Sequence, residues 1–402
     1  MNHGLRYYDE SLDPQTCTNS NDGRDCWGDV DDLNRPETYA GMEYQEPREH
    51  SIDFIEAELV PEMVHARCFC DKDSREFVEF ESATVRLVEL SRTSEIYRVE
   101  AIVRFSGESR GFPLLVKMLP EDTDRSGTAF DAYQNEEMFY SKMTAKYGTD
   151  LSPKCYLADL GRYGRPVIVL DDLEAVDYAP ADGELDEDRL RLCVKVLGKF
   201  HGRGLRLKAT EPDVFREYES KLLEIALTDE SMAQYEKRSN RLMDTLESLP
   251  DSRLAENVRK KLNKSPLETL KSIVSEVNEI STICHGHFSH DNLLFKYQNG
   301  KPIDVKVIDW QTMRYCSPAV DLGPILLYNM KRENGPTELQ EILALYAESV
   351  KSEYPEISIE RLTENIVDKF LFACLILSFQ EHISDEEFTQ IILHLERLNV
   401  FD

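Results

Sequence analysis

An amide and a carboxylate flank a predicted β-hairpin in the second half of the chain. Asn292–Tyr297 and Val305–Trp310 have the composition of strands, and the Asn-Gly dipeptide between them favours a tight turn because both residues adopt positive φ at low cost. An antiparallel return places the start of the first strand beside the end of the second, so Asn292 and Asp309 are expected to converge. Two hard oxygen ligands at short range suit Mg²⁺, with phosphate supplying further ligands. Spacing alone also leaves open an ordinary hairpin with polar ends.

A histidine-rich segment leads into this hairpin and reads Cys284-His-Gly-His-Phe-Ser-His-Asp-Asn. It resembles the phosphotransferase loop His-Gly-Asp-x-x-x-x-Asn. From about residue 52 to 400 the chain resembles the ecdysteroid kinase-like (CHK kinase-like) family, which belongs with choline kinases and aminoglycoside phosphotransferases in the protein-kinase-like superfamily. The resemblance rests on the shared order of several motifs, each weak alone: Leu114-Leu-Val-Lys-Met-Leu-Pro, Phe130-x5-Glu136-x3-Tyr140, Val169-Leu-Asp-Asp-Leu, Val196-Leu-Gly-Lys-Phe-His, His285-Gly…Asn292-Leu-Leu-Phe, Val307-Ile-Asp-Trp-Gln and Ser317-Pro-Ala-Val-Asp-Leu.

The resemblance implies an α+β, bilobal protein-kinase-like fold with a small β-rich N-lobe and a larger, mostly helical C-lobe. We expect a nucleotide-binding N-lobe over residues 51–173, and a C-lobe with the catalytic loop and substrate-binding helices over residues 174–402. It also implies ATP and Mg²⁺ as cofactors and a small hydroxylated molecule as substrate, with a steroid-like alcohol suggested by the family name.

Two side chains in the first half match the family's phosphate-binding pair. Lys117 ends an apolar strand, where an unpaired lysine is costly to bury, although a lysine can also snorkel from a strand edge. The resemblance makes Lys117 the ligand of the α- and β-phosphates and Glu136 its ion-pair partner. Helical spacing alone fits Glu137 as well as Glu136, and only the family pattern selects Glu136.

Further roles follow from the resemblance. Asn292 and Asp309 would hold Mg²⁺. The segment from Asp171 to Leu173 would be the hinge that touches adenine through backbone groups, and Asp321 would anchor the catalytic loop. His201 is interpreted as a core histidine with satisfied hydrogen bonds rather than a catalyst.

The catalytic loop departs from the family at the position that matters most for proton transfer. Where the family has the catalytic Asp, this chain has His287. A neutral imidazole can accept a proton, but it is bulkier and brings no negative charge near Mg²⁺ and ATP, so we expect a loss of about 10²- to 10⁴-fold, the worth of a positioned general base. Asp291 could substitute only if the loop shifted.

The turn that should cover the phosphates departs as well, since Leu90–Tyr97 contains no glycine to let backbone amides approach phosphate closely. Ser91, Thr93 and Ser94 could donate hydroxyl groups and Arg92 a charge, whereas Glu95 would repel. Zinc is a further alternative at the loop, through His285, His287, His290 and Asp291, but these side chains are not expected to share one face.

The elements that must position these residues change character along the chain. Alternating and β-branched runs over residues 77–119 predict a β-meander, and a helix is expected at 128–147. Long helical stretches are expected at 211–280 and 336–399. The ten-residue apolar run Phe370–Phe379 is too short to span a bilayer and predicts a buried helix.

Composition limits the function classes. The chain has 402 residues, with 76 acids against 47 bases, and this balance argues against nucleic-acid and anionic-membrane partners. Residues 1–50 are polar and aperiodic, which predicts a disordered acidic tail without a signal peptide. Nine scattered cysteines are interpreted as free thiols of a cytoplasmic protein.

Two hypotheses remain. The first is an ATP-dependent O-phosphotransferase of the CHK kinase-like type whose activity is impaired or unusual because of His287. The second is a pseudokinase, with the same fold used as a ligand-binding or regulatory module. Lys117, Glu136, Asn292 and Asp309 favour retained ATP and Mg²⁺ binding, while His287 and the glycine-free turn favour the second hypothesis.

Overall fold

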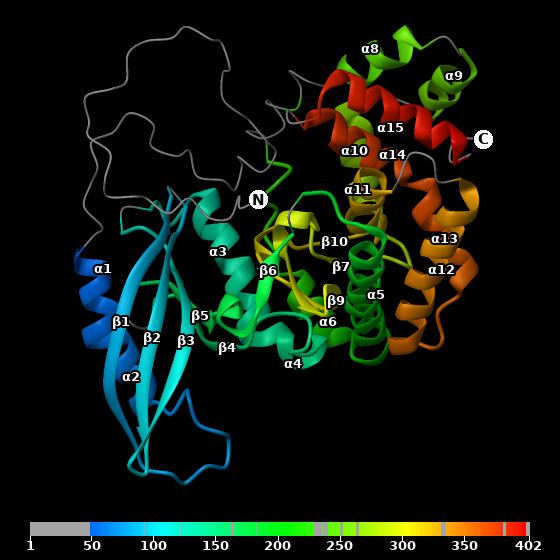
Figure 1. Ribbon diagram of the computed structural model, residues 1–402. Helices are drawn as coiled ribbons and strands as arrows, with labels where there is room; N and C mark the ends of the chain where they lie inside the picture. Colours follow the sequence, from blue (N-terminus) through cyan, green and yellow to red (C-terminus); the bar gives the residue numbers. More distant parts are fainter. Residues whose placement is uncertain are drawn as a thin grey trace, which may run out of the picture.

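The chain folds into a sheet-rich lobe followed by a helical lobe, as a computed structural model shows (Figure 1). The structure describes residues 49–398 apart from 92, 122, 162–164, 182, 229–234, 236–239, 250–251, 263–264, 331–334 and 381–382. The predicted disordered tail over residues 1–50 falls almost entirely outside the described residues, and the predicted boundary after Leu173 stays a proposal.

The N-lobe is built on a five-stranded antiparallel sheet with the order β1-β2-β3-β5-β4. Its strands are β1 (Val78–Leu90), β2 (Glu95–Phe105), β3 (Glu108–Met118), β4 (Cys155–Asp159) and β5 (Val167–Asp171). The first three strands follow one another as the predicted meander. Alternate residues of β2 are buried, so one face of the sheet must be covered.

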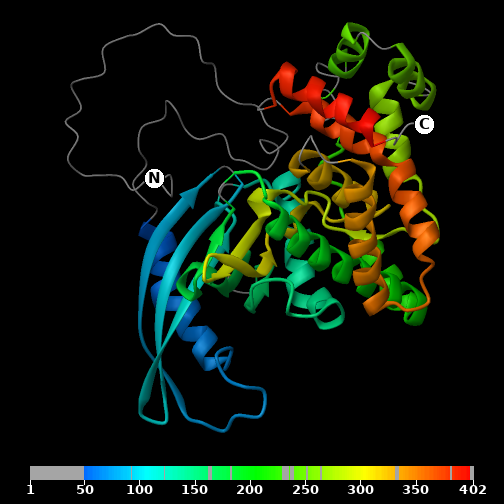
Figure 2. The same cartoon turned by 45° about the vertical axis from the view of Figure 1, so that its right-hand side comes forward.

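A continuous N-terminal helix covers that face, and both views show it running along the sheet (Figures 1 and 2). It comprises α1 (Glu49–Phe54), a π-helical turn (Ile55–Leu59) and α2 (Val60–His65). Its fully buried apolar side chains pack against β2 and β3 in one core cluster. This helix supplies five of the sixteen buried residues of the N-lobe core cluster: Ile55, Leu59, Val60, Met63 and Val64.

The helix predicted at 128–147 is present as α3 (Thr128–Met138), a π-helical turn (Phe139–Met143) and α4 (Thr144–Tyr147). It lies between the sheet and the C-lobe (Figure 1). The stacked rings of Phe139 and Trp310, with centroids 3.7 Å apart, join this helix to the segment that follows Asp309. This contact fixes α3 against the C-lobe hairpin.

The C-lobe is mainly helical, and its helices gather on the side of the molecule away from β1 (Figures 1 and 2). They are α5 (Glu187–Thr210), α6 (Pro212–Glu219), α8 (Asn240–Ser248), α9 (Ser252–Lys261), α10 (Pro266–Ser275), α11 (Ala319–Asn329), α12 (Pro336–Glu353), α13 (Ile359–Asp368), α14 (Phe370–Phe379) and α15 (Asp385–Arg397). The apolar run Phe370–Phe379 forms the buried helix α14, as predicted. The expected helical stretch over 211–280 is interrupted, because residues 222–225 are not helical.

Two small sheets interrupt the helices. One has the order β6-β8-β9, with β6 (Tyr178–Pro180), β8 (Leu293–Gln298) and β9 (Lys301–Val307), and the other pairs β7 (Thr282–Cys284) with β10 (Arg314–Cys316). Strands β8 and β9 form the predicted hairpin, and its turn has the positive φ angles of 53° at Asn299 and 74° at Gly300. Asn292 lies in a short 3₁₀ turn just before β8 rather than in the strand.

No helix in the described part of the chain is long and apolar enough to cross a membrane. The seven cysteines within the described residues are free thiols, as the sequence predicts.

Candidate active site

Three charged side chains from three elements meet between the lobes. Lys117 Nζ, from β3, lies 2.6 Å from Glu136 Oε2 of α3 and 3.4 Å from Asp309 Oδ1. Glu136 is buried, while Glu137 is only partly buried, so the structure selects the same acid as the family pattern. The Tyr133 hydroxyl donates to the Lys117 carbonyl at 2.9 Å and ties α3 to the end of β3.

The two carboxylates keep the lysine charged. Burial on its own would lower the pKa of Lys117, but the negative charges of Glu136 and Asp309 outweigh it and raise the pKa above its usual value. The charged ammonium group thus lies beside one buried carboxylate and one carboxylate that is 25% exposed, and it can attract an anion that reaches this exposed side.

The hairpin brings the predicted metal ligands to one place. Leu293 pairs with Val307, and Ile308 N donates to the Asn292 carbonyl at 3.0 Å, so the residue just before β8 and the residues just after β9 are neighbours. Asp309 has a φ of 63°, which turns its side chain out of the strand path. An amide oxygen and a carboxylate form a donor set that fits Mg²⁺.

Asp321 anchors the segment that is predicted to be the catalytic loop. Its carboxylate accepts hydrogen bonds from the backbone N–H groups of His285 at 2.7 Å and Gly286 at 2.8 Å. His201 Nε2 lies 3.1 Å from the same carboxylate, and its Nδ1 lies 2.7 Å from the Tyr346 hydroxyl. His201 is thus a fully buried histidine with both ring nitrogens engaged, and Asp321 has the anchoring position that the resemblance implied.

Gly286 is required where the loop passes Thr312. Its φ is 88°, and a Cβ built there would lie 1.9 Å from the Thr312 carbonyl oxygen. Any side chain would push the loop away from the Asp309 segment. The glycine therefore sets how closely the two ligand-bearing segments approach each other.

Hydrogen bonds define the tautomer of His287. Asn292 Nδ2 donates to the His287 carbonyl at 3.0 Å, which fixes the orientation of the amide, and lies 3.3 Å from His287 Nδ1. Since an amide nitrogen is only a donor, this contact favours the tautomer in which Nδ1 accepts and Nε2 carries the ring proton. His287 therefore presents an N–H group, not a lone pair, on its far side.

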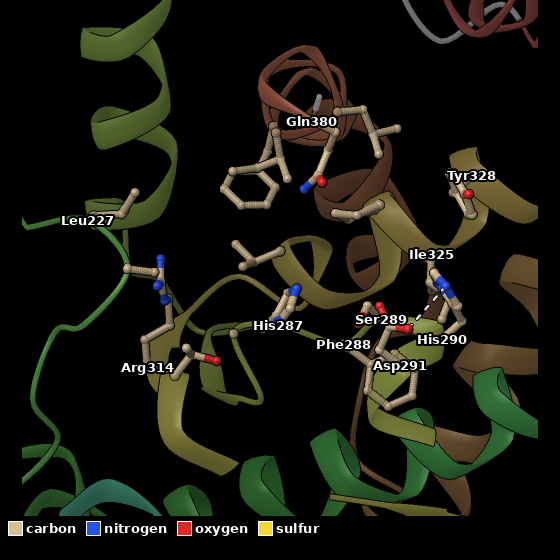
Figure 3. Close-up of a pocket in the computed structure, with 18 of the residues that line it drawn as sticks. Leu227, His287, Phe288, Ser289, His290, Asp291, Arg314, Ile325, Tyr328 and Gln380 are labelled. Carbon is tan, nitrogen blue, oxygen red and sulfur yellow. Dashed lines mark ion pairs between the residues drawn. The ribbon is translucent and has the colours of Figure 1, made fainter. Parts of the chain in front are cut away.

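His287 also lines a cavity of about 110 Å³. In Figure 3 the side chains of His287 and Gln380 point into the space between the loop and α14, and Arg314 rises along the wall beside Leu227. The walls are chiefly apolar and include Leu227, Tyr235, Phe288, Val320, Ile325, Tyr328, Phe372, Ile376 and Leu377. The cavity is thus mainly apolar, and the loop residues Gly286 to Asp291 form one of its walls.

The histidines of the loop do not gather around a common point. His285 is fully buried with Nε2 3.0 Å from the Ile308 carbonyl, whereas His290 stacks on Tyr328 and pairs with Asp291 at 3.4 Å (Figure 3). The zinc alternative is therefore not supported. Within the described residues the three-ligand grouping with metal-like distances is His201, Cys284 and Asp321, all buried, and its His and Asp are engaged by the hydrogen bonds above.

The turn between β1 and β2 is closed by its own hydroxyl groups. Ser91 Oγ accepts from Ser94 N at 2.8 Å and donates to the Ser94 carbonyl at 2.9 Å. The expected repulsion from Glu95 is wrong, because this side chain is fully buried and pairs with Arg165 at 3.1 Å. Sequence could not show this, since the compensating cation lies 70 residues away. Arg92 lies outside the described residues.

The predicted hinge uses much of its backbone internally. Asp171 N donates to the Lys154 carbonyl at 2.9 Å, and Asp172 N donates to the Pro113 carbonyl at 3.0 Å. The Asp172 side chain pairs with Arg98 and accepts from Glu174 N. Of the three predicted hinge residues, Leu173 is therefore the one whose backbone N–H could donate a hydrogen bond to the adenine ring.

Four side chains near the site were not predicted from the sequence: Asn135, Glu224, Arg314 and Gln380. Asn135, Glu224 and Arg314 contact residues distant in the sequence, and Gln380 lines a cavity that distant segments form, so no spacing signal could have identified these roles. Arg314 alone had a possible signal, since it follows the Val307-Ile-Asp-Trp-Gln motif closely.

The paired lobes, with a lysine–glutamate pair on one side and a loop and aspartate on the other, define a protein-kinase-like fold of the small-molecule kinase type. The chain belongs to the ecdysteroid kinase-like family, whose model matches residues 92–357. A search of curated proteins finds no match.

Several solved structures are similar to the chain in outline. The ethanolamine kinase of Plasmodium vivax is 12% identical, with a TM-score of 0.43, over 79% of this chain and 82% of that one. The choline kinase of Cryptosporidium parvum Iowa II is also 12% identical, with a TM-score of 0.43, over 79% and 89%. The GDP complex of wild-type aminoglycoside 2'-phosphotransferase-IIIa is 13% identical, with a TM-score of 0.38, over 88% and 98%.

Proposed function

We propose that the protein is an ATP-dependent O-phosphotransferase that acts on a small, largely apolar alcohol, with weak or unusual turnover because of His287. The observation that carries the proposal is the meeting of Lys117, Glu136 and Asp309 at 2.6 and 3.4 Å, next to a loop whose His287 lines an apolar cavity. A buried lysine held between two acids is expensive to maintain for stability alone. Binding of an anionic ligand such as ATP would explain why the chain keeps Lys117 at this position.

On the nucleotide side, each residue has a distinct task. Lys117 binds the α- and β-phosphates, and the ion pair with Glu136 orients the ammonium group of Lys117. Asn292 and Asp309 would hold Mg²⁺, which neutralises charge that develops on the transferred phosphoryl group. Leu173 offers its N–H to the base. The glycine-free turn leaves fewer backbone amides for the phosphates than a glycine-rich loop would.

On the acceptor side, the cavity favours a neutral, apolar molecule with a few polar groups. Among the described residues that line it, the only acid is Asp291, whose side chain is 39% exposed and paired with His290. Arg314 Nε and Gln380 Oε1 are buried there without hydrogen-bond partners among the described residues. A ligand that satisfies them needs an acceptor and a donor on an apolar body, which a steroid-like alcohol provides.

In the transfer step, the bond between the γ-phosphorus and the ADP oxygen breaks while a bond to the acceptor oxygen forms, and the hydroxyl proton must leave. With Nδ1 facing Asn292, the neutral His287 ring donates from Nε2 and can orient the acceptor oxygen but cannot take its proton. The proton then goes to water or to the phosphoryl oxygens, and this step is slow compared with transfer to a positioned carboxylate.

The same observation favours a second candidate function. If His287 serves only as a donor, the site is suited to hold MgATP and an apolar ligand without transfer, as a ligand-binding or regulatory module. The two functions share their binding residues and differ only in turnover.

A thermal-shift titration tests the shared part. We expect ATP to raise the melting temperature only with Mg²⁺ present, and Lys117→Met to remove most of the rise. Glu276→Ala is the control and should respond like the wild type, because Glu276 pairs with Lys369 and does not line the cavity. An ATP response that is equal with and without Mg²⁺, or that survives Lys117→Met, contradicts the assignment.

A further inference from the structure

Asn135 joins three segments of the site through one fully buried amide. Its Nδ2 donates to the carbonyls of Leu223 and Gln311, both at 2.8 Å, and its Oδ1 accepts from Leu223 N at 3.0 Å. Asn135 directly precedes Glu136 on α3, and Gln311 Nε2 lies 3.3 Å from Glu136 Oε2. The position of the lysine's partner is thus tied to the segment after α6 and to the turn after Asp309.

Glu224 fastens the other side of the same segment. Its Oε1 accepts from the backbone N–H groups of Ala226 at 3.0 Å and Leu227 at 2.9 Å, and pairs with Arg314 Nη2 at 3.0 Å. Ala226, Leu227 and Arg314 all line the apolar cavity. The non-helical segment from Leu223 to Leu227 therefore touches α3 at one end and forms a cavity wall at the other.

We propose that Asn135 and Glu224 are positioning residues that couple occupation of the acceptor cavity to the alignment of Glu136 with Lys117. The inference rests on the proposed function, because it gives the cavity an acceptor and the lysine a nucleotide. A ligand that presses on Leu227 shifts the segment, and Asn135 passes the shift to α3. By thermodynamic linkage, nucleotide binding changes acceptor affinity by the same factor.

Glu224 separates this role from a merely structural one. Its side chain is 42% exposed and contacts neither Lys117 nor Glu136, but its removal leaves the buried Arg314 without this carboxylate and should lower the melting temperature. Coupling predicts, in addition, weaker nucleotide binding when Glu224 is removed. Glu276 is a matched control for the loss of stability, since this 62% exposed acid also pairs with a buried base, Lys369 at 2.9 Å, and does not line the cavity.

The test is a double-mutant cycle read out as MgADP affinity by titration calorimetry. We expect Asn135→Ala to weaken binding about tenfold and Glu224→Ala several-fold, with the double variant no weaker than Asn135→Ala alone, because both changes release the same segment. Glu276→Ala should bind like the wild type. Wild-type affinity in Glu224→Ala, or effects that add, overturns the coupling.

Amide hydrogen exchange on the same variants keeps the inference separate from the proposed function. Glu224→Ala should speed exchange within α3, whereas Glu276→Ala should not. If wild-type protein binds no MgADP, the proposed function fails, and faster exchange in α3 still supports the mechanical link. Unchanged exchange in α3 overturns the link whether or not nucleotide binds.

Discussion

Replacement of His287 by aspartate is the perturbation that separates the two candidate functions. His287→Asp puts a carboxylate where the neutral ring now donates an N–H, while Asn292 Nδ2 keeps the His287 backbone carbonyl as its acceptor at 3.0 Å. The new carboxylate can accept the hydroxyl proton. A positioned general base is worth about 10²- to 10⁴-fold in rate, which corresponds to about 2.7–5.5 kcal/mol of activation free energy. We expect turnover to rise within that range.

The assay is transfer of labelled γ-phosphoryl from ATP to a panel of apolar alcohols, with hydrolysis to phosphate measured beside it. His287→Asn is the matched control, because it removes the ring without adding a base, and it should not gain activity. Asp309→Ala should abolish transfer in either background. Our reasoning is refuted if His287→Asp binds MgATP yet turns over no faster than wild type, while His287→Asn abolishes the wild-type activity.

Two further predictions concern stability. Burial lowers the pKa of His285 below its usual value, so the unfolded chain takes up a proton first as the pH falls below about 6.5. The stability present above that pH is lost on acidification, and melting temperatures of His285→Gln should fall less steeply there than those of wild type; parallel curves would contradict this. Removal of residues 1–48 should leave the melting temperature unchanged, whereas removal of residues 1–65 should abolish folding, since Ile55, Leu59 and Met63 are fully buried and each is worth about 1.5–3 kcal/mol. A stable 66–402 fragment would show that the helix is dispensable.

The parts of the fold that the sequence predicts are those whose signal is local. The β-meander, the helix at 128–147 and the buried helix Phe370–Phe379 follow from residue periodicity or a continuous apolar run. The break in the helical stretch after α6 could not be predicted, because Asn135 and Arg314, distant in sequence, supply the hydrogen bonds that hold it.

The candidate site divides in the same way. Lys117, Glu136 and Asp309 were found through ordered motifs, and the structure brings them together. The misjudged Glu95 is a charged residue whose surroundings depend on tertiary contacts, here Arg165 and Ser51. A side chain's partners across the fold, rather than its own type, decide whether it faces a ligand or the core.

A crystal structure of the protein with Mg²⁺ and a non-hydrolysable ATP analogue tests the central claim most directly. We expect the α- and β-phosphates beside Lys117 Nζ, the metal between Asn292 Oδ1 and the Asp309 carboxylate, and the γ-phosphate facing the cavity at His287. Density for the analogue elsewhere would contradict the account. So would a metal that does not contact Asp309, with the 3.4 Å contact between Lys117 and Asp309 unchanged.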